Sequence, residues 1–414
     1  MATHDVLIIG GGISGLAFAW HAARAGHRPK VLEAGPRLGG CLDSRRGPDG
    51  YWFELGAHTL YNSYGALLEI VEGCRPRPSI VARGDARKRF ARLRDGSLTT
   101  MGPLSVFRQF SFLELATNGP RALFGKDQPG ATTREHFSRL VGAHNYDAVL
   151  GPFLSAVPSQ IVDDFPASGP GSLFKKRPRR KDVIKSFTFD GGLGALPAAI
   201  AREAGVETEV GAPAAAVRAK DGAFEVELAD GRKLDAAVVA IATDPATAAR
   251  LTTPVSAALA TALSALKTLE LESLGVVVAR DAVKLPELAF VVPTGDVFWS
   301  AVTRDPVPDG RHRAFTFHFK PGVGRAAQRK RVAEVLGISE GAFETVEEKR
   351  TVLPSPGRDH AQAVASIDRA LAGTRALALT GNYFAGMAIE DCIARAKSEW
   401  ARVGGSVAAM ARAS

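Results

Sequence analysis

The first forty residues alternate apolar runs with glycine-rich turns, and this arrangement constrains the fold of the 414-residue chain more than any other feature. Residues 5–9 are a continuous apolar run with β-branched members, which is typical of a buried parallel strand. The Gly-Gly-Gly-Ile-Ser-Gly run of residues 10–15 follows directly, and residues 16–25 predict an Ala-rich helix that ends at Gly26. Residues 28–33 predict a second strand that ends in an acidic residue. This order predicts a dinucleotide-binding βαβ unit.

Each part of this unit has a physical task at a dinucleotide. Gly10 permits the tight turn, Gly12 lets the backbone approach a pyrophosphate, and Gly15 lets the helix pack closely on the strand. The N-terminus of the helix faces the negative charge of the phosphates. Glu33 can accept hydrogen bonds from a ribose 2′-hydroxyl and would repel a 2′-phosphate, which disfavours NADP. The predicted cofactor contacts in this unit are Gly10, Gly12, Ile13, Ser14, Gly15 and Glu33.

A second glycine motif follows and identifies the dinucleotide by resemblance. Residues 33–40 read Glu-Ala-Gly-Pro-Arg-Leu-Gly-Gly, which resembles the ExxxRxGG extension of glutathione-reductase-like FAD proteins, especially the flavin amine oxidase superfamily. The glycine pair lets a second loop cross close over the pyrophosphate, and Arg37 can neutralise phosphate charge. The resemblance implies FAD as the cofactor, with further contacts from Ala34, Arg37, Gly39, Gly40 and Cys41.

Two later segments resemble protoporphyrinogen and coproporphyrinogen oxidases within that superfamily. Residues 53–60, FELGAHTL, are similar to an ELGPH(T/S) segment that lies beside the isoalloxazine ring, with Ala57 in place of proline. Gly56 would let the backbone meet the flavin edge. His58 is a candidate catalytic residue, and a structural hydrogen-bonding role is the alternative.

The second of these segments is GNYFAGMAIEDCI at residues 381–393, which resembles the closing motif of the same oxidases. A helix starting near Gly386 would direct its N-terminal dipole at the flavin pyrimidine and stabilise the charge that appears there on reduction. Its apolar face would carry Ile389, Ile393, Ala396, Trp400 and Val403. The resemblance implies cofactor contacts at Gly56, Ala57, His58, Val217, Gly381, Asn382, Met387 and Ala388.

A basic stretch at residues 83–94 supplies a candidate substrate contact. It contains Lys88-Arg89-Phe90 shortly before Asp95-Gly96, a hairpin turn signal. Protoporphyrinogen oxidases carry an N-R-F element before such a turn, whose arginine binds a substrate propionate, and Arg89 is the matching position. The alternative is a solvated pair of charged strands.

The rest of the chain predicts a mixed α/β fold in three parts. The resemblance implies a glutathione-reductase-like FAD-binding Rossmann domain formed by residues 1–84, 186–250 and 374–414. An antiparallel substrate-binding sheet domain would comprise residues 85–100 and 251–373, with strands at 274–279, 289–292, 298–302 and 314–319 and a helix at 326–336. Residues 101–185 predict a helical insertion with helices at 103–115 and 132–154.

Composition adds weaker expectations. The net charge of +9 attracts anions such as carboxylate substrates, phospholipid head groups or nucleic acid, and selects none of them. Six of the seven residues at 175–181 are basic, which fits either a membrane-surface contact or a solvated loop. Three cysteines without CxxC spacing fit a reducing compartment and predict no metal site. We find no secretory signal or transmembrane run, so we expect a cytoplasmic protein, with peripheral membrane contact as an alternative.

The resemblance implies FAD-dependent oxidation of a porphyrinogen, with O₂ as the electron acceptor. The partner would be a small, carboxylated substrate, and we expect no nucleic acid. Another flavin oxidase or dehydrogenase of the superfamily, acting on an amine, amino acid or polyene, stays open as an alternative. Many amine oxidases place a lysine near the flavin on a substrate-sheet strand, but the strand at 274–279 carries none and Lys267 lies upstream. A non-catalytic carrier of the same fold is the other alternative.

Overall fold

The N-terminal apolar run forms the central strand of a seven-stranded sheet in the computed structural model, which describes residues 4–124 and 129–413. This strand, β1 (His4–Ile9), is fully buried from Val6 to Ile8. Its neighbours β2 and β13 run parallel to it, as do the outer strands β10 and β19. The order is β10 (Glu207–Val210), β2 (Pro29–Glu33), β1, β13 (Lys233–Ile241), β12 (Ala223–Leu228) and β11 (Ala214–Lys220), with β19 (Leu377–Leu379) also on β13. This sheet therefore has the parallel centre that the βαβ pattern predicts.

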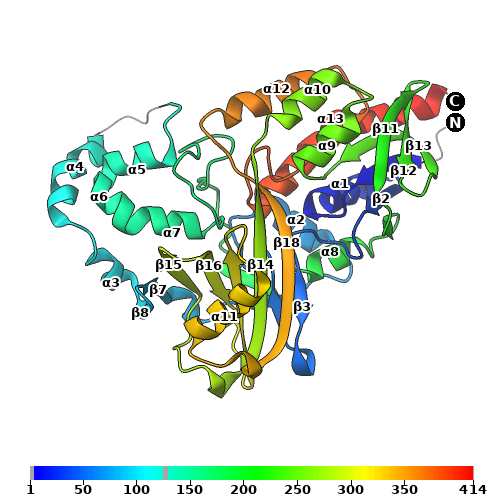
Figure 1. Ribbon diagram of the computed structural model, residues 1–414. Coiled ribbons are helices and arrows are strands. Elements are labelled where there is room, and N and C mark those ends of the chain that lie inside the picture. The colour runs from blue at the N-terminus through cyan, green and yellow to red at the C-terminus, as the bar shows by residue number, and fades with distance from the viewer. Residues whose placement is uncertain (1–3, 125–128, 414) are drawn as a thin grey trace.

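Two helices that are far apart in the sequence pack together on this sheet (Figure 1). The first, α1 (Ile13–Arg24), is followed by Gly26 with φ +89°, as the glycine signal predicts. The second, α13 (Ile389–Ala413), buries Ile389, Ile393, Ala396 and Val403 and packs Trp400 against Phe18 at 5.5 Å between ring centroids. The predicted apolar face is confirmed. The helix begins at Ile389 rather than near Gly386, because residues 381–388 form turns instead.

The second seven-stranded sheet is the long one in the middle of Figure 1. Its order is β18 (Phe343–Pro354), β14 (Thr268–Ala279), β17 (His312–Phe319), β16 (Phe298–Thr303), β15 (Phe290–Thr294), β7 (Phe90–Arg94) and β8 (Ser97–Met101). The strands are antiparallel, as predicted, except that β7 and β15 run parallel. A parallel pair needs a long crossover, and here the chain between β8 and β15 includes the helical insertion.

The two faces of this sheet have different neighbours, which follows from the two-residue period of a strand. On β17, Phe315 and Phe317 belong to the core formed with α11 (Arg325–Leu336). The residues between them face the other way, and the Thr316 hydroxyl donates to the backbone carbonyl of Glu54 at 2.6 Å. The second face of this sheet therefore faces the segment that contains β4 (Trp52–Glu54).

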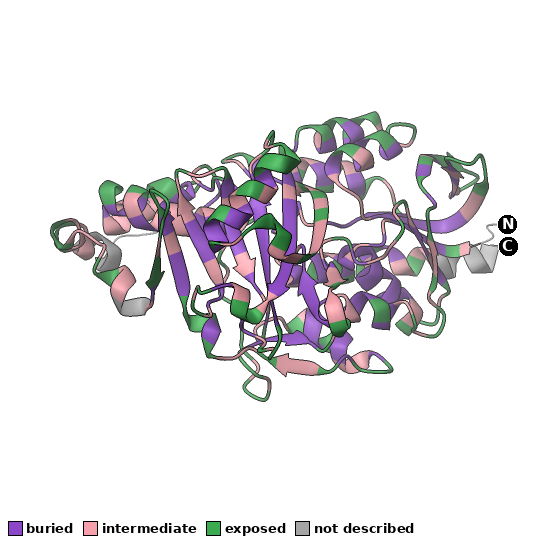
Figure 2. Ribbon diagram, turned by 60° about the horizontal axis from the view of Figure 1, so that its bottom comes forward, coloured by how far each residue is buried: buried purple, intermediate pink, exposed green. Residues whose placement is uncertain are grey.

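The helical insertion lies at the far end of the molecule from the termini (Figure 1). Its helices are α3 (Pro103–Phe107), α4 (Phe112–Phe124), α5 (Thr133–Val141), α6 (Ala143–Asn145) and α7 (Gly151–Ala156), with a π-helical turn at Tyr146–Leu150. The predicted helix at 132–154 is broken at Gly142, whose φ of +95° is not helical. Figure 2 shows that this region carries less buried surface than the two sheets. Phe153 fixes α7 to the second sheet through an edge contact with Phe90.

Shorter elements complete the fold. They are the hairpin β3 (Ser44–Arg46) and β4 (Trp52–Glu54), the small sheet β5 (Leu60–Tyr61), β9 (Ser186–Phe189) and β6 (Ile80–Ala82), and the helices α2 (Gly65–Gly73), α8 (Ala195–Ile200), α9 (Pro245–Thr252), α10 (Ala257–Ser264) and α12 (His360–Ala372). Within residues 4–124 and 129–413, no helix has both the length and the apolar character of a bilayer span.

Candidate active site

The first glycine loop leaves the N-terminus of α1 open to a ligand. Gly10 has φ +108°, and a Cβ atom there would lie 2.6 Å from the Ala242 carbonyl oxygen. A Cβ atom on Gly15 would lie 2.0 Å from the Gly10 carbonyl oxygen. Gly12 precedes α1 and caps it with no side chain, and the first turn carries no acidic residue. The amides of Ile13 and Ser14 therefore keep the unsatisfied donors that attract an anion.

The second glycine loop crosses directly over the first. Gly12 and Gly39 form a parallel bridge, and the Gly39 amide donates to the Gly11 carbonyl at 2.8 Å. A Cβ atom on Gly40 would lie 3.1 Å from the Gly12 Cα atom, so the crossing depends on small residues. The Glu33 carboxylate accepts hydrogen bonds from the amides of Gly11 and Gly35, both at 2.8 Å. These contacts hold the carboxylate at the carboxyl end of β2, where a nucleotide ribose would meet it.

Arg37 is held beside this crossing by a buried carboxylate. Its guanidinium donates to the Gly40 carbonyl at 2.9 Å and pairs with Asp43, which is fully buried. The Lys349 ammonium lies 2.7 Å from the same carbonyl and 3.0 Å from Asp43. Burial opposes ionisation of Asp43, but Lys349 and Arg45 hold its pKa below the ordinary value. A network of cations thus fixes the second glycine loop.

Lys349 was not predicted. It comes from β18, whose middle carries four consecutive charged residues at 347–350, so neither an apolar run nor a regular alternation marks it as a strand. It pairs in register with Ser273 on β14. The second sheet therefore directs a lysine toward the glycine loops from β18, the strand beside β14.

The segment at residues 53–60 packs on the second glycine loop. A Cβ atom on Gly56 would lie 2.1 Å from the Cys41 carbonyl oxygen, and the Ala57 amide donates to that carbonyl at 2.9 Å. We expected Gly56 to allow close approach of a flavin, but the protein's own packing already requires a glycine. Cys41 is a free, half-buried thiol. Ala34 directly follows the last residue of β2 and is exposed.

His58 begins a chain of three polar side chains that continues through His318 on β17 to Ser273 on β14 of the second sheet. Its Nε2 lies 3.3 Å from Nε2 of His318 on β17, and Nδ1 of His318 lies 2.8 Å from the Ser273 hydroxyl. Burial lowers the pKa of His318 to about 4, and burial together with His318 and Arg83 lowers that of His58 well below the ordinary value. Both imidazoles are therefore neutral at pH 7, and one hydrogen lies between them.

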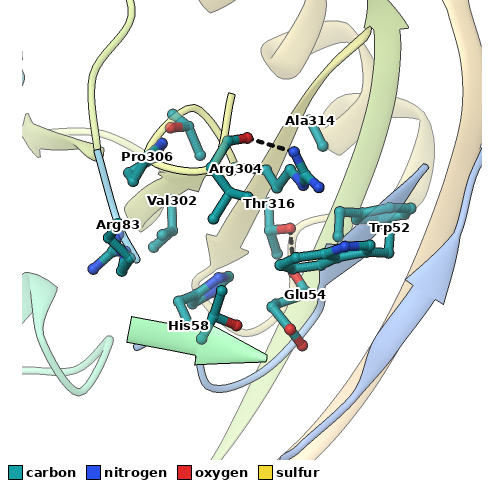
Figure 3. A pocket seen from close by; sticks show the side chains of 13 residues that line it. Trp52, Glu54, His58, Arg83, Val302, Arg304, Pro306, Ala314 and Thr316 are labelled. Atoms are coloured by element: carbon teal, nitrogen blue, oxygen red, sulfur yellow. Dashed lines mark hydrogen bonds between the residues drawn. The ribbon is translucent and has the colours of Figure 1, made fainter. Parts of the chain in front are cut away.

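A small cavity opens beside His58, and Figure 3 shows the side chains that line it. Its volume is about 20 Å³, which is room for little more than one small polar group, since a water needs ~10–15 Å³. The lining residues lie on β4, β9, β16 and β17, in the turn between β16 and β17, at His58 and at Arg83 just after β6. Trp52, Glu54, Arg83, Arg304 and Thr316 contribute its polar and aromatic groups.

Arg89 lies outside this cavity. It is exposed, and its carbonyl accepts a hydrogen bond from the Ala289 amide at 2.8 Å. The predicted turn is present, since Asp95 and Gly96 have φ +49° and +75° between β7 and β8. The basic stretch sends a different residue, Arg83, into the cavity. Arg83 lies in the basic stretch, but the sequence does not set it apart from the other arginines there, and Arg304 lies in no motif.

The closing motif connects α13 with the helical insertion. Gly381 is buried and Asn382, Met387 and Ala388 are half-buried. Met387 packs on the apolar core of the insertion. Val217 lies elsewhere, buried in β11, which follows the two amides that donate to the carbonyls of Gly35 and Glu33. Four of these predicted contacts therefore lie in the segment before α13, and Val217 lies in the first sheet. Their role toward a cofactor stays a prediction.

Half of the basic run at 175–181 is tied into the protein. Lys175 donates to the Ala385 carbonyl at 2.7 Å and pairs with Asp391 at 3.2 Å, and Arg177 pairs with Asp391 at 2.9 Å. Arg180 pairs with Glu72 of α2. The other basic residues of the run, Lys176, Arg179 and Lys181, are exposed. The run therefore fastens the insertion to the closing motif, and only its exposed half could meet a membrane.

Solved structures of similar fold cover almost the whole chain. A candidate protoporphyrinogen oxidase from Exiguobacterium sp. 255-15 is 21% identical, with a TM-score of 0.77 over 96% of this chain and 98% of that chain. Putrescine oxidase bound to putrescine is 15% identical, with a TM-score of 0.67 over 97% and 99%. At these identities the likeness shows the fold, and the predicted mixed α/β class with its two sheets is confirmed.

Sequence relatives match shorter segments. Human protoporphyrinogen oxidase is 55% identical over 53 residues, which are 12% of this chain and 11% of that protein. The 15-cis-phytoene desaturase of Narcissus pseudonarcissus is 38% identical over 60 residues, 14% of this chain and 10% of that protein. The chain thus matches about a tenth of the length of these curated relatives. The profile of the flavin containing amine oxidoreductases matches residues 13–320, and the chain therefore belongs to this family of flavoprotein oxidoreductases.

Proposed function

We propose that this flavoprotein binds FAD non-covalently and oxidises a porphyrinogen, with O₂ as the electron acceptor. The observation that carries the cofactor proposal is the crossing of the two glycine loops above the uncapped N-terminus of α1. We expect a pyrophosphate to bind there, because the helix N-terminus attracts negative charge and because Gly12 and Gly40 have no side chains that would fill the space. Glu33 would accept hydrogen bonds from the adenosine ribose, and Arg37 would add positive charge. When bound, FAD supplies a two-electron acceptor for the substrate.

The chain's own groups suit an oxidation that releases protons. Each two-electron step removes two hydrogens from the substrate, and O₂ leaves as hydrogen peroxide. The neutral imidazoles of His58 and His318 can take a proton only transiently, because their lowered pKa makes them weak bases at pH 7, and Ser273 orients the inner ring. We propose His58 as the group nearer the substrate, because it lines the cavity whereas His318 is buried.

The porphyrinogen proposal draws on the likeness to protoporphyrinogen oxidases and on the surplus of cations. Human protoporphyrinogen oxidase shares the highest identity among the relatives named above. Porphyrinogens carry propionates, and arginines bind carboxylates with two parallel hydrogen bonds. The basic stretch with Arg89 and the arginine-lined cavity offer such partners on the side of the substrate sheet.

An amine oxidase is the second candidate function, and one observation favours it. Lys349 reaches the second glycine loop from the substrate sheet, the part of the fold from which many amine oxidases present a lysine to their flavin. In this chain, however, the ammonium is bound to Asp43 and to the Gly40 carbonyl. We rank the amine below the porphyrinogen because this lysine is already neutralised.

Flavin bleaching without oxygen separates these candidates. The purified protein is mixed anaerobically with protoporphyrinogen, coproporphyrinogen, putrescine or phytoene, and the flavin absorbance is followed. We expect a porphyrinogen to bleach the flavin and readmission of O₂ to restore the colour with release of hydrogen peroxide. Bleaching by putrescine or phytoene alone would overturn the porphyrinogen proposal. A colourless protein that retains no flavin would instead favour a carrier of the same fold.

A further inference from the structure

A second cavity lies in the helical insertion, between α5 and the segment that joins α7 to β9. Its volume is about 280 Å³, whereas the cavity beside His58 has a volume of about 20 Å³. An apolar cavity of about 150 Å³ is enough to hold a benzene molecule. The described residues that line the second cavity include none of those proposed above for the cofactor or the porphyrinogen.

Most of the wall of this cavity is apolar, which suits a hydrocarbon. It is formed by Phe137 of α5 and by Pro166, Ala167, Leu173 and Phe174 of the joining segment. Phe137 and Leu173 also pack on the buried core of the insertion, whereas Phe174 is 56% exposed. A large exposed apolar side chain beside a cavity is typical of a binding site.

Hydrogen bonds fix the joining segment on both sides of the cavity. On one side, the amide and the hydroxyl of Thr133 both donate to the Phe165 carbonyl, at 2.7 and 3.1 Å. On the other side, the Lys175 ammonium donates to the Ala385 carbonyl at 2.7 Å. Because both sides are fixed, a ligand need not order these walls, which lowers the free-energy cost of binding.

Two basic side chains at the cavity are left without a partner. Within residues 4–124 and 129–413, the imidazole of His136 and the ammonium of Lys176 form no hydrogen bond or ion pair. Lys175, the third basic residue of the lining, is already paired with Asp391. No acidic side chain is among the described residues that line the cavity. The apolar wall is therefore combined with donors that suit an anionic group.

We propose that this cavity binds a short fatty acid. The acyl chain would lie against Phe137, Leu173 and Phe174, and the carboxylate would accept hydrogen bonds from Lys176 and His136. Small-molecule sites span ~300–1,000 Å³, and this cavity lies at the lower end of that range. Its size therefore favours one short chain over the two chains of a phospholipid.

Titration calorimetry with octanoate tests this site without turnover. The purified protein is titrated with octanoate, with neutral octanamide of the same length, with acetate, and with vesicles of phosphatidylcholine and phosphatidylglycerol. We expect saturable binding of one octanoate per chain and at least tenfold weaker binding of octanamide and of acetate. Equal affinity for octanamide, or binding of the vesicles without binding of octanoate, would overturn the proposal.

Matched variants locate the binding. Lys176→Met should weaken octanoate binding at least tenfold, whereas Lys181→Met should leave it unchanged, because Lys181 is exposed in the same basic run and does not line the cavity. Ala167→Phe fills the cavity and should abolish binding while both cations remain. Equal losses in the two lysine variants, or wild-type affinity in Lys176→Met, would overturn the site. If Ala167→Phe does not fold, the comparison of the two lysines still decides.

Competition with a porphyrin separates this site from the proposed porphyrinogen site. A saturating concentration of coproporphyrin should leave the affinity for octanoate unchanged, because the cavity lacks the residues proposed for the porphyrinogen. Loss of octanoate binding in its presence would assign the cavity to the substrate route and overturn the fatty-acid site.

Discussion

The candidate sites at the two seven-stranded sheets are built in different ways. On the first sheet, the candidate cofactor site is made of backbone atoms and glycines within residues 10–40, so its parts are neighbours in the sequence. On the second sheet, the cavity is made of side chains from distant segments, and the His58–His318 contact joins residues 260 positions apart. A site built from a local backbone shape leaves a complete motif, whereas a site assembled by folding leaves only fragments, such as the segment that carries His58. This difference explains which residues could be predicted.

Substitution of the loop glycines should have the largest effect and should separate cofactor binding from folding. Gly12→Val places a side chain in the space above α1, where only the Gly40 Cα atom lies within 4 Å, so we expect complete loss of flavin from a folded protein. Glu33→Arg replaces a ribose acceptor with a donor and should also release the flavin. Each change should cost at least ~2 kcal/mol of binding free energy.

Gly15→Ala is the matched comparison, because its Cβ atom would collide with the Gly10 carbonyl at 2.0 Å. This variant should lose thermal stability as well as flavin. Absorbance spectra and circular dichroism measure the two effects. Wild-type flavin content in both Gly12→Val and Glu33→Arg would remove the site from these loops.

Breaking the buried ion pair of the second sheet should cause the largest loss of folding stability among these variants. Arg313 and Asp305 are both at most 5% exposed, so Arg313→Leu leaves an uncompensated buried carboxylate. We expect a loss of ~3–5 kcal/mol in unfolding free energy. The exposed pair Arg218–Glu227 on the first sheet is the control, and Arg218→Leu should cost at most ~1 kcal/mol. Similar losses in both variants, measured by denaturant unfolding, would contradict this ranking.

Glu54 contacts β17 of the second sheet through its carbonyl and the Leu193 amide through its carboxylate. Titration of this carboxylate should make the folding stability depend on pH. Burial raises the pKa of its carboxyl group to about 7 in the folded protein. Between pH 4.5 and 7 the unfolded chain loses this proton first, so its contribution to folding stability falls as the pH rises. Glu54→Gln lacks this titration and can keep the hydrogen bond from the Leu193 amide. Its stability relative to wild type should grow by up to ~3 kcal/mol across this range, and a difference independent of pH would contradict the assignment.

Arg89 gives a smaller effect, restricted to the substrate. If Arg89 binds a propionate, Arg89→Ala should raise the KM for the porphyrinogen and leave the flavin content unchanged. The fall in kcat/KM should correspond to a loss of ~1.5–3 kcal/mol in transition-state stabilisation. Arg89→Lys should recover part of the loss, since lysine offers only a point charge. Wild-type kinetics in Arg89→Ala would remove it from the site.

The control for this experiment follows from the structure. Arg92 is unsuitable, because it donates to the Ala148 carbonyl at 3.0 Å and so ties β7 to the helical insertion. Arg94 is two-thirds exposed and pairs only with Asp95, so Arg94→Ala should leave the kinetics unchanged.

The sequence predicted the elements whose signals are local. The apolar run of β1, the loop glycines and the apolar face of α13 were visible because period and spacing repeat over short distances. The strand β18 was missed because four consecutive charged residues interrupt its apolar positions, and Lys349 was missed with it. The insertion helix was predicted without its break at Gly142. Arg83 and Arg304 come to one cavity only after folding; the basic stretch does not single out Arg83, and no motif marks Arg304.

Acid precipitation of the purified protein tests most directly whether the two crossing glycine loops hold FAD without a covalent bond. We expect a yellow protein whose flavin passes entirely into the supernatant, where chromatography identifies it as FAD in about equal molar amount to the chain. Cys41, a free thiol next to Gly40, is the residue at which a thioether link could form. A pellet that stays fluorescent, or a released flavin that is FMN, would contradict the prediction.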